Sequence, residues 1–325
     1  MKTGWILIGL IIHCLGALAS DRIVVAKDGT GHFQTVQQAI DAVPDNARSE
    51  TVIYIKNGRY KEKITIPEPK GKIRMIGESV EGVVLTYDDF ASRKDGAGNN
   101  IGTSGSASFF LFAPDFTAEN ITFENSAGPV GQAVAARITG DRATFINCRF
   151  LGFQDTLYTH GDSSRQYYSN CYIEGSVDFI FGAATAVFDS CTIYAKQQGY
   201  FTAASTPEGR PYGYVFRNCL LKGDGSKATF FLGRPWRPFA KTVFLFCHMD
   251  AVVKPEGWNN WGKKENEHTT LYAEYKNSGP GYLPDKRVGW ASQLSDKEAA
   301  NYTLSNIFNG WQPPAPAVAK SKSGG

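Results

Sequence analysis

A four-residue pattern that recurs six times through the middle of the chain limits the possible folds more than any other feature. Each copy alternates polar and apolar side chains, as half-buried strands do, and five of the six have Cys as the second residue. The starts of successive copies are separated by 27, 23, 20, 28 and 28 residues, with no useful helical period between them. The copies begin at Asn120, Asn147, Asn170, Ser190, Asn218 and Phe246.

A strand in every 20 to 28 residues predicts a solenoid whose coils carry loops of unequal length. The Leu/Asn consensus of leucine-rich repeats is absent, and propeller blades need about 40 residues each. We therefore expect an all-β fold, a single-stranded right-handed parallel β-helix. Stacked Asn side chains can then form a hydrogen-bonded ladder at a turn, while stacked Cys and Ile side chains fill the bore.

Each end of such a solenoid needs a capping element. Thr35 to Pro44 has a T-x-x-Q capping box and apolar residues at one-face helical spacing, so we expect a short N-terminal capping helix there. Thr51 to Ile55 and Lys63 to Ile66 are expected as early strands. Beyond Trp258 the repeat fades, and we expect loops and a closing helix.

The N-terminal segment has the features of a secretory signal peptide. Met1 to Ser20 contains a basic start, an apolar run and a small-x-small motif that ends at Ala19. A retained membrane anchor is the alternative, but the run falls short of the ~20 residues needed to span a bilayer. We expect residues 1–19 to be removed, 20–312 to form one secreted domain, and 313–325 to be a flexible tail.

Charge and cysteine content argue against several classes of partner and against a structural metal site. Lys plus Arg number 34 and Asp plus Glu 31, with no basic run, so neither nucleic acid nor a membrane is expected as a partner. Five cysteines remain after the signal peptide, and none forms a C-x-x-C pattern, so no structural metal is expected. Most of the five are predicted to be core residues of the stacked strands.

Two aspartates occupy the same place in neighbouring copies of the repeat. Asp155 follows Asn147 by eight residues, and Asp178 follows Asn170 by eight. If the Asn residues stack, the two carboxyl groups lie about one inter-strand spacing apart, roughly 4.8 Å. Two carboxyl groups at so short a separation cannot ionise independently, so one stays protonated while the other is anionic. This is the arrangement of a general acid beside a nucleophile or base.

Neighbouring motifs support a catalytic role. Gln154 precedes Asp155, and Gln132 lies one coil earlier; neutral amides can stabilise an oxyanion. The Leu-Gly-Arg-Pro-Trp segment supplies Arg234, which could hold one carboxylate ionised, and Trp236, which could stack on a sugar ring. Each signal alone is weak, because an Asp in a turn is more often only a turn residue. The equal eight-residue spacings from Asn147 to Asp155 and from Asn170 to Asp178 favour the catalytic interpretation over that alternative.

These segments resemble the signature stretches of the pectin methylesterases, the aspartyl esterases of carbohydrate esterase family 8. The resemblance runs from about Ile23 to Trp311 and includes five motifs in the family's order. It implies a parallel β-helix and an enzyme that demethylesterifies homogalacturonan, releases methanol and leaves galacturonate. The matched segments are Gly58 to Glu62, Gln132 to Arg137, Gly152 to Tyr158, Asp178 to Gly182 and Leu232 to Trp236.

The resemblance also implies roles for single residues. Asp178 corresponds to the nucleophile, Asp155 to the proton donor that later acts as base, and Arg234 to the residue that orients the nucleophile. Gln132 and Gln154 correspond to the oxyanion-stabilising amides. The resemblance implies a disulfide between Cys171 and Cys191, and it implies that the enzyme needs no metal or organic cofactor. Substrate-binding positions are Thr103, Gln132, Tyr158, Phe181, Arg234 and Trp236.

Other functions are less consistent with the sequence. No G-x-S-x-G or H-E-x-x-H motif occurs, which disfavours serine hydrolases and zinc proteases. We expect a monomer whose partner is the polysaccharide substrate. Two alternatives stay open: an esterase of the same family that acts on another ester or thioester, and a non-catalytic carbohydrate-binding β-helix.

Overall fold

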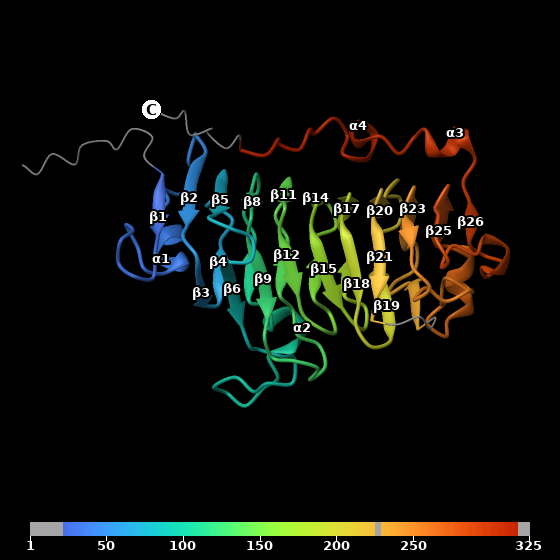
Figure 1. Cartoon of the computed structure of the whole chain (residues 1–325), viewed down its shortest axis with the longest axis horizontal. Helices are drawn as coiled ribbons and strands as arrows, with labels where there is room; N and C mark the ends of the chain where they lie inside the picture. The colour runs from blue at the N-terminus through green and yellow to red at the C-terminus, as the bar shows by residue number, and fades with distance from the viewer. Residues whose placement is uncertain (1–21, 225–228, 318–325) are drawn as a thin grey trace, which may run out of the picture.

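Three parallel sheets run side by side along the long axis of the molecule (Figure 1). The structure is a computed structural model that describes residues 22–224 and 229–317. The expected signal peptide, residues 1–19, lies outside the described residues. From β2 to β24 successive strands pass in turn from one sheet to the next, so each complete coil contributes one strand to each sheet. Every pairing between named strands is parallel. The parallel β-helix predicted from the repeat is confirmed.

The largest sheet has 11 strands and the other two have eight and seven. Its strands are β1 (Ile23–Val25), β2 (Thr51–Ile55), β5 (Ile73–Gly77), β8 (Thr117–Glu119), β11 (Ala143–Ile146), β14 (Arg165–Ser169), β17 (Thr185–Asp189), β20 (Tyr214–Arg217), β23 (Lys241–Leu245), β25 (Leu271–Tyr275) and β26 (Ser292–Gln293).

The eight-stranded sheet is β3 (Gly58–Lys61), β6 (Val83–Tyr87), β9 (Thr122–Asn125), β12 (Arg149–Leu151), β15 (Tyr172–Gly175), β18 (Thr192–Ala195), β21 (Leu220–Gly223) and β24 (His248–Met249). The seven-stranded sheet is β4 (Ile64–Ile66), β7 (Phe109–Leu111), β10 (Ala136–Ile138), β13 (Leu157–Thr159), β16 (Ile180–Gly182), β19 (Gly199–Ala204) and β22 (Phe230–Gly233).

The repeated tetrapeptide forms the tight corner between the 11-stranded and the eight-stranded sheets. The first residue of every copy has a positive φ, between 51° and 57°, which Asn tolerates better than most residues. The Asn147 amide donates to Asn120 Oδ1 at 2.6 Å, and the Asn170 amide donates to Asn147 Oδ1 at 3.3 Å. The predicted Asn ladder is therefore present over three coils, and it fixes the register of the coils.

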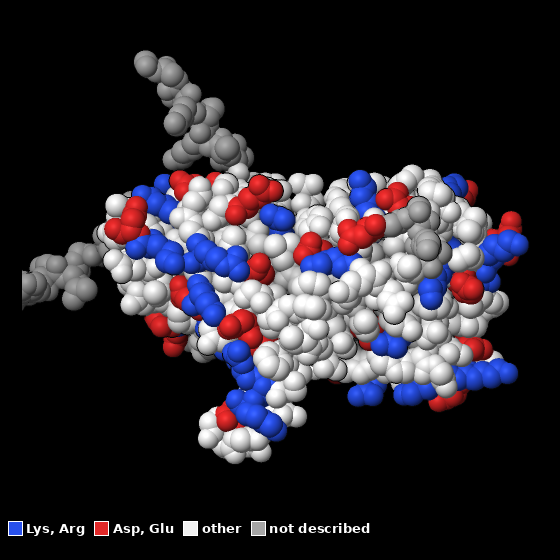
Figure 2. Space-filling view, turned by 60° about the horizontal axis from the view of Figure 1, so that its bottom comes forward, with Lys and Arg blue, Asp and Glu red and all other residues white. Residues whose placement is uncertain are grey.

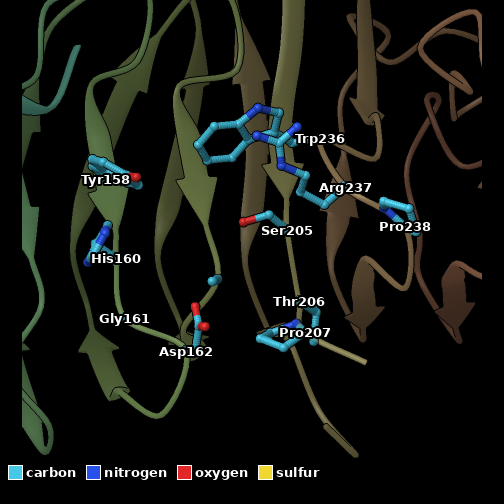
Figure 3. A pocket seen from close by; sticks show the side chains of 11 residues that line it. Tyr158, His160, Gly161, Asp162, Ser205, Thr206, Pro207, Trp236, Arg237 and Pro238 are labelled. Atoms are coloured by element: carbon cyan, nitrogen blue, oxygen red, sulfur yellow. The ribbon is translucent and has the colours of Figure 1, made fainter. Parts of the chain in front are cut away.

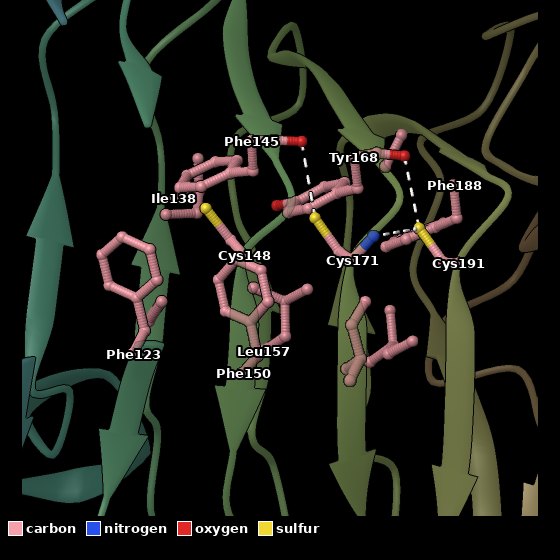
Figure 4. Packing of buried hydrophobic residues seen from close by; sticks show 14 of the residues in the cluster. Phe123, Ile138, Phe145, Cys148, Phe150, Leu157, Tyr168, Cys171, Phe188 and Cys191 are labelled. Carbon is pink, nitrogen blue, oxygen red and sulfur yellow. Dashed lines mark hydrogen bonds between the residues drawn. The ribbon is translucent and has the colours of Figure 1, made fainter. Parts of the chain in front are cut away.

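The residue after each corner points into the bore. Cys148, Cys171 and Cys191 form a column beside a stack of aromatic rings that includes Phe145, Tyr168 and Phe188 (Figure 4). Centroids of neighbouring rings in this stack lie 5.1 and 4.8 Å apart. Burial of these apolar side chains on successive coils supplies most of the stabilisation that holds the solenoid together.

The expected disulfide between Cys171 and Cys191 is not formed in the structure. All five cysteines of the described chain are buried free thiols. Each thiol is satisfied by a backbone carbonyl instead: Cys171 Sγ lies 3.4 Å from the Phe145 oxygen, and Cys191 Sγ lies 3.4 Å from the Tyr168 oxygen. The column therefore functions as core packing, as expected for Cys148, Cys219 and Cys247.

The helical cover at the N-terminal end is where the sequence placed it. α1 (Val36–Asp41) begins after Thr35, whose side chain accepts a hydrogen bond from the Gln38 amide. Val36, Ala39 and Ile40 are fully buried against the first coil, because they share one helical face. A second short helix, α2 (Gly102–Gly105), lies on a segment that projects from the solenoid (Figure 1).

The C-terminal region contains one more coil than the sequence indicated. Lys276 and Asn277 replace Asn and Cys at this corner, so the repeat is not recognisable although Lys276 keeps the positive φ of 46°. β25 extends the 11-stranded sheet, and the Asn277 side chain accepts a hydrogen bond from the Cys247 amide at 2.8 Å. Two 3-10 turns, Lys264–His268 and Pro284–Lys286, flank β25.

The last described segment returns along the 11-stranded sheet as a strap, residues 294–317 (Figure 1). It contains two short helices, α3 (Asp296–Ala299) and α4 (Leu304–Ile307), where the sequence predicted one closing helix. Residues 313–317 were expected to begin a flexible tail, but the Ala315 oxygen accepts from Arg74 and the Ala317 amide donates to Glu119. Prolines in this stretch keep the chain extended, so its backbone polar groups can follow the sheet.

Candidate active site

The two aspartates counted at equal offsets lie side by side on consecutive coils. Asp155 precedes β13 and Asp178 precedes β16, and the pairing of Leu157 with Ile180 places the two residues opposite each other. The Asp155 amide donates to the Val177 oxygen at 3.1 Å. Both aspartates have positive φ, 65° and 52°, and both are at least 93% buried. The structure therefore brings the two carboxyl groups together as the sequence predicted.

Arg234 forms a two-pronged ion pair with one of the two aspartates. Its Nε and Nη2 donate to the two carboxylate oxygens of Asp178 at 2.9 and 2.7 Å. The guanidinium lies between two aromatic rings, 3.9 Å from the centroid of Tyr200 and 3.7 Å from that of Trp261. Bidentate pairing and stacking both favour Arg in a fixed orientation, which in turn fixes the Asp178 carboxylate.

The surroundings of the pair affect the pKa values of the two carboxyl groups differently. Burial, and next the negative charge of Asp178, raise the pKa of Asp155 well above its ordinary value. Burial also raises the pKa of Asp178, but the hydrogen bonds and charge of Arg234 oppose that shift. Of the two, Asp155 therefore has the stronger tendency to keep its proton, and Arg234 favours the anionic form of Asp178.

Two side-chain amides lie beside the carboxyl pair. Gln132 and Gln154 form a parallel bridge on neighbouring coils, and Gln154 directly precedes Asp155. Gln132 is exposed and Gln154 partly exposed, and within the described residues neither amide makes a side-chain hydrogen bond. Their N–H groups are thus free to donate to an atom of a bound molecule.

A row of aromatic side chains continues from the carboxyl pair along the outer face of the seven-stranded sheet. Tyr158 and Phe181 stack with centroids 4.2 Å apart, and Trp236 lies 6.2 and 5.8 Å from them. Thr103 lies on α2, whose segment is tied to Gln132 because the Ala91 amide donates to the Gln132 oxygen. All the site residues expected from the sequence thus lie on one face or on the segment beside it.

A hollow of roughly 320 Å³ opens at the end of this row (Figure 3). Tyr158 and Trp236 belong both to the row and to the lining of the hollow. Polar groups complete the lining, among them His160, Asp162 and Arg237. The carboxyl pair, the aromatic row and the hollow therefore follow one another on the same face of the molecule.

The sequence did not indicate the two rings that stack on Arg234, those of Tyr200 and Trp261. Trp261 and Trp258 are three residues apart, yet Trp258 is buried in the bore against Tyr272 and Trp261 packs on Arg234. Trp261 has a positive φ of 61°, which turns it outward. No sequence pattern distinguishes the two tryptophans, because the difference depends on a loop conformation.

The described chain offers no obvious metal site. Within residues 22–224 and 229–317, no group of three or more His, Cys, Asp or Glu is arranged to hold a metal ion. Over the same residues, none of the helices has the length and apolar character needed to span a bilayer.

Comparison with known proteins gives the family. The pectinesterase family model matches residues 22–311. The chain belongs to the pectinesterase family. Pectinesterase 31 of Arabidopsis thaliana is 45% identical over 292 residues, which cover 88% of this chain and 92% of that protein. Pectinesterase 4 of the same plant is 38% identical over 306 residues, but the match covers only 51% of its length.

Solved pectin methylesterases have the same fold. The carrot enzyme is 31% identical with a TM-score of 0.83, and the match covers 90% of this chain and 95% of that chain. A pectin methylesterase in complex with a hexasaccharide is 32% identical with a TM-score of 0.80, over 92% of this chain and 100% of that one. The chain is accordingly a pectinesterase, a carboxylic ester hydrolase acting on homogalacturonan.

The raised pKa of Asp155 predicts a stability cost in this pectinesterase. The folded protein keeps the Asp155 proton above pH 3.8, whereas the unfolded chain releases it, so wild-type stability falls as pH rises from about 3.8 to the folded-state pKa. Asp155→Asn removes this titration. We expect the variant to have a Tm several degrees higher than wild type at pH 7, with the difference vanishing near pH 4. Thermal unfolding at several pH values measures this, and an equal or lower Tm at pH 7 would contradict it.

Proposed function

We propose that the esterase reaction runs through an acyl-enzyme on Asp178. A carboxylate oxygen of Asp178 attacks the C6 carbonyl carbon of a methyl-esterified galacturonate, and the carbonyl oxygen becomes an oxyanion that accepts hydrogen bonds from Gln132 and Gln154. The C–OCH₃ bond then breaks, and the Asp155 proton moves to the departing oxygen to give methanol.

The second half of the reaction restores the enzyme. Asp155, now a carboxylate, takes a proton from a water molecule, and the resulting hydroxide attacks the acyl carbon. The bond from that carbon to Asp178 breaks, which releases the Asp178 carboxylate and a galacturonic acid unit, and the latter loses its proton to solvent to give galacturonate. Asp155 regains its proton in the same step, so one acid–base group serves both halves.

The main support for this proposal is that two carboxyl groups in register with each other have different partners. Arg234 binds both oxygens of Asp178 and favours its anionic form, while Asp155 lies in the same buried space without such a partner among the described residues. An anion beside a protonated acid is what the two-step reaction requires.

The aromatic row supports a polysaccharide as the substrate. Tyr158, Phe181 and Trp236 present flat apolar faces on which sugar rings can pack, and related pectin methylesterases have been solved with hexasaccharides bound. We assign Thr103 to the same substrate contact surface. A different ester or thioester substrate and a non-catalytic carbohydrate-binding role are the alternatives.

We further propose that the protein is secreted after removal of residues 1–19 and acts as a monomer on cell-wall pectin. The basic, apolar and small-residue order of that segment supports export. Pectin is a cell-wall polymer, so an extracellular location agrees with the family's substrate.

Methanol release from highly esterified pectin, assayed with excess chelator, tests the reaction. Rapid quenching during the first turnover, followed by digestion and mass spectrometry, tests the intermediate: we expect a galacturonoyl adduct on the peptide that contains Asp178. An adduct on another residue would contradict the assignment of the nucleophile. Absence of methanol from a folded protein would direct attention to other esters and thioesters.

A further inference from the structure

A second hollow, of roughly 300 Å³, lies where the strap passes over the first coils of the 11-stranded sheet. Figure 1 shows the strap running along this sheet. The strap contributes Trp311 and Pro314 to the lining, and the sheet contributes Thr117 on β8 together with residues at the corners before β2, β5, β8 and β11. The hollow shares no lining residue with the carboxyl pair, the aromatic row or the hollow of Figure 3.

One wall of this second hollow is an indole ring held in a fixed position. The Trp311 ring centroid lies 4.9 Å from that of Phe308 and 5.8 Å from the guanidinium carbon of Arg165. Arg165 is itself fixed, because it donates to the Phe308 oxygen at 2.9 Å. Trp311 is only half-buried, and Pro314 adds a second apolar surface beside it. A pre-positioned, partly exposed indole offers a flat face on which the apolar face of a sugar ring can pack.

Two threonines beneath the strap have hydroxyl groups without partners. Thr117 lines the hollow and is 3% exposed, and its hydroxyl makes no hydrogen bond within the described chain. Thr144 is in register with Thr117 and fully buried, and its Oγ1 has no partner among the described residues. Buried hydroxyl groups are normally hydrogen-bonded, so this pair indicates that a polar molecule binds here.

The charged groups at the hollow balance one another. Lys72 and Arg142 contribute two positive charges, and Glu50 and Asp115 contribute two negative charges. Arg142 Nε and Nη2 donate to the two oxygens of Asp115 at 2.5 and 2.7 Å. A bound carboxylate would lie near two like charges, and so would a bound ammonium group, which favours an uncharged ligand.

Balanced charge is also found elsewhere on the molecule. On the face shown in Figure 2, basic and acidic side chains are interspersed over much of the surface. Long-range attraction therefore does not direct a ligand to one region, and recognition at the hollow depends on direct contacts.

Hydrogen-bonding capacity remains at the hollow for an uncharged polar ligand. Among residues 22–224 and 229–317, the Lys72 ammonium donates only to the Arg48 oxygen, at 2.9 Å, so two of its N–H groups remain. Glu50 Oε1 accepts from Arg74 at 3.0 Å, while Oε2 has no partner in the same residues. Each hydroxyl of a sugar ring both donates and accepts a hydrogen bond. A sugar ring therefore matches the combination of donor, acceptor, hydroxyl and indole face.

We propose that this hollow, here called the strap site, binds a methyl-esterified galacturonate ring of the substrate polymer. The esterified ring is an uncharged pyranose, and its hydroxyls can bond Lys72, Glu50 and Thr117 while its apolar face packs on the indole. The strap site lies on the 11-stranded sheet, whereas the aromatic row lies on the seven-stranded sheet. Other rings of a chain already held at the aromatic row are present near the strap site at high effective concentration.

The strap site gives the enzyme a preference for unreacted polymer. Hydrolysis converts the neutral ester into a carboxylate, which the negative charges of Glu50 and Asp115 disfavour. Attachment at the strap site therefore weakens as a region of the polymer is demethylated, and the enzyme moves to regions that are still esterified.

Fluorine NMR of protein labelled with 5-fluorotryptophan tests the strap site directly. Trp311→Phe assigns the strap-site resonance, and Trp236→Phe assigns a resonance of the aromatic row. In the Asp178→Ala background, a fully methyl-esterified galacturonate hexamer should shift the Trp311 resonance along a saturable curve. Unesterified hexagalacturonate should bind there at least about tenfold more weakly. Mass spectrometry of the recovered hexamer checks that its esters stay intact.

Two variants and a matched control test the proposed contacts. Lys72→Gln and Thr117→Val should each weaken hexamer binding at the Trp311 resonance by about threefold to tenfold, since each removes a hydrogen bond to the ring. Lys222→Gln is the control, because Lys222 is an exposed lysine on β21 of the eight-stranded sheet. We expect wild-type affinities for this control at both assigned resonances.

The resonances of Trp311 and Trp236 separate the possible outcomes. A Trp311 resonance that stays fixed while that of Trp236 moves would overturn the proposal, as would equal affinity for the esterified and the unesterified hexamer. A response at Trp311 to cellohexaose but not to the esterified hexamer would overturn the choice of polymer. A shift at Trp311 without one at Trp236 would support the strap site and contradict sugar binding at the aromatic row.

Discussion

Asp178→Asn is expected to lower kcat for methanol release from esterified pectin by at least about 10⁴-fold, since it removes the proposed nucleophile. The Asn oxygen can still accept a hydrogen bond from Arg234, so the local geometry and the fold should persist. Methanol assays at saturating pectin, together with circular dichroism and thermal unfolding, measure both effects. The KM should change little, because the aromatic row that binds the sugar rings is untouched.

Two further variants make this result decisive. Asp189→Asn changes a carboxyl group at the end of β17, in the same coil but on the 11-stranded sheet, and should retain wild-type activity. Asp178→Ala excludes slow deamidation of Asn to Asp as a source of residual activity. Near-wild-type methanol release by folded Asp178→Ala would show that another group attacks the ester.

Asp155→Asn is expected to lower methanol release by about 10²- to 10⁴-fold, the usual contribution of a general acid–base group. The size of the loss should depend on the leaving group. Methoxide needs a proton as it leaves, whereas p-nitrophenolate is stable without one. With a p-nitrophenyl ester of galacturonate, the variant should therefore acylate at nearly the wild-type rate and then stall, because no base activates water.

The kinetic signature of that stall is a burst. Stopped-flow absorbance should show one nitrophenolate per active site, followed by a slow steady state. Wild type should show a much faster steady state under the same conditions. An equal loss on the methyl and the p-nitrophenyl ester would mean that Asp155 positions Asp178 rather than transferring a proton.

The sequence predicted the solenoid and the juxtaposition of Asp155 and Asp178 for a common reason. Both depend on register: Asn147 and Asn170 stack at the corner, so Asp155 and Asp178, eight residues further on, stack as well. A count along the chain is enough when the coils are parallel and the corner is tight. The burial that raises the pKa of both carboxyl groups was also foreseeable from the apolar neighbours of Asp178.

Features that depend on loops or on long-range contacts were not predictable in this way. The environment of Trp261 depends on a left-handed turn, and Tyr200 reaches Arg234 from another strand of the same sheet. The corner at Lys276 was not recognised because its side chains differ while its backbone conformation is the same. The free state of Cys171 and Cys191 reflects thiol orientation, which the spacing of the repeat does not encode.

The strap of residues 294–317 affects how the molecule can unfold. In an open solenoid each coil contacts only its neighbours, so either end can fray alone. Here Tyr275 bonds Asp296 near the last coil, Arg165 donates to the Phe308 oxygen midway, and Glu119 and Arg74 hold Ala317 and Ala315 near the first coils. Loss of a coil between β5 and β25 must therefore also release the strap from its contacts with that coil. By linking coils that are otherwise held only by their neighbours, the strap opposes fraying over this part of the solenoid.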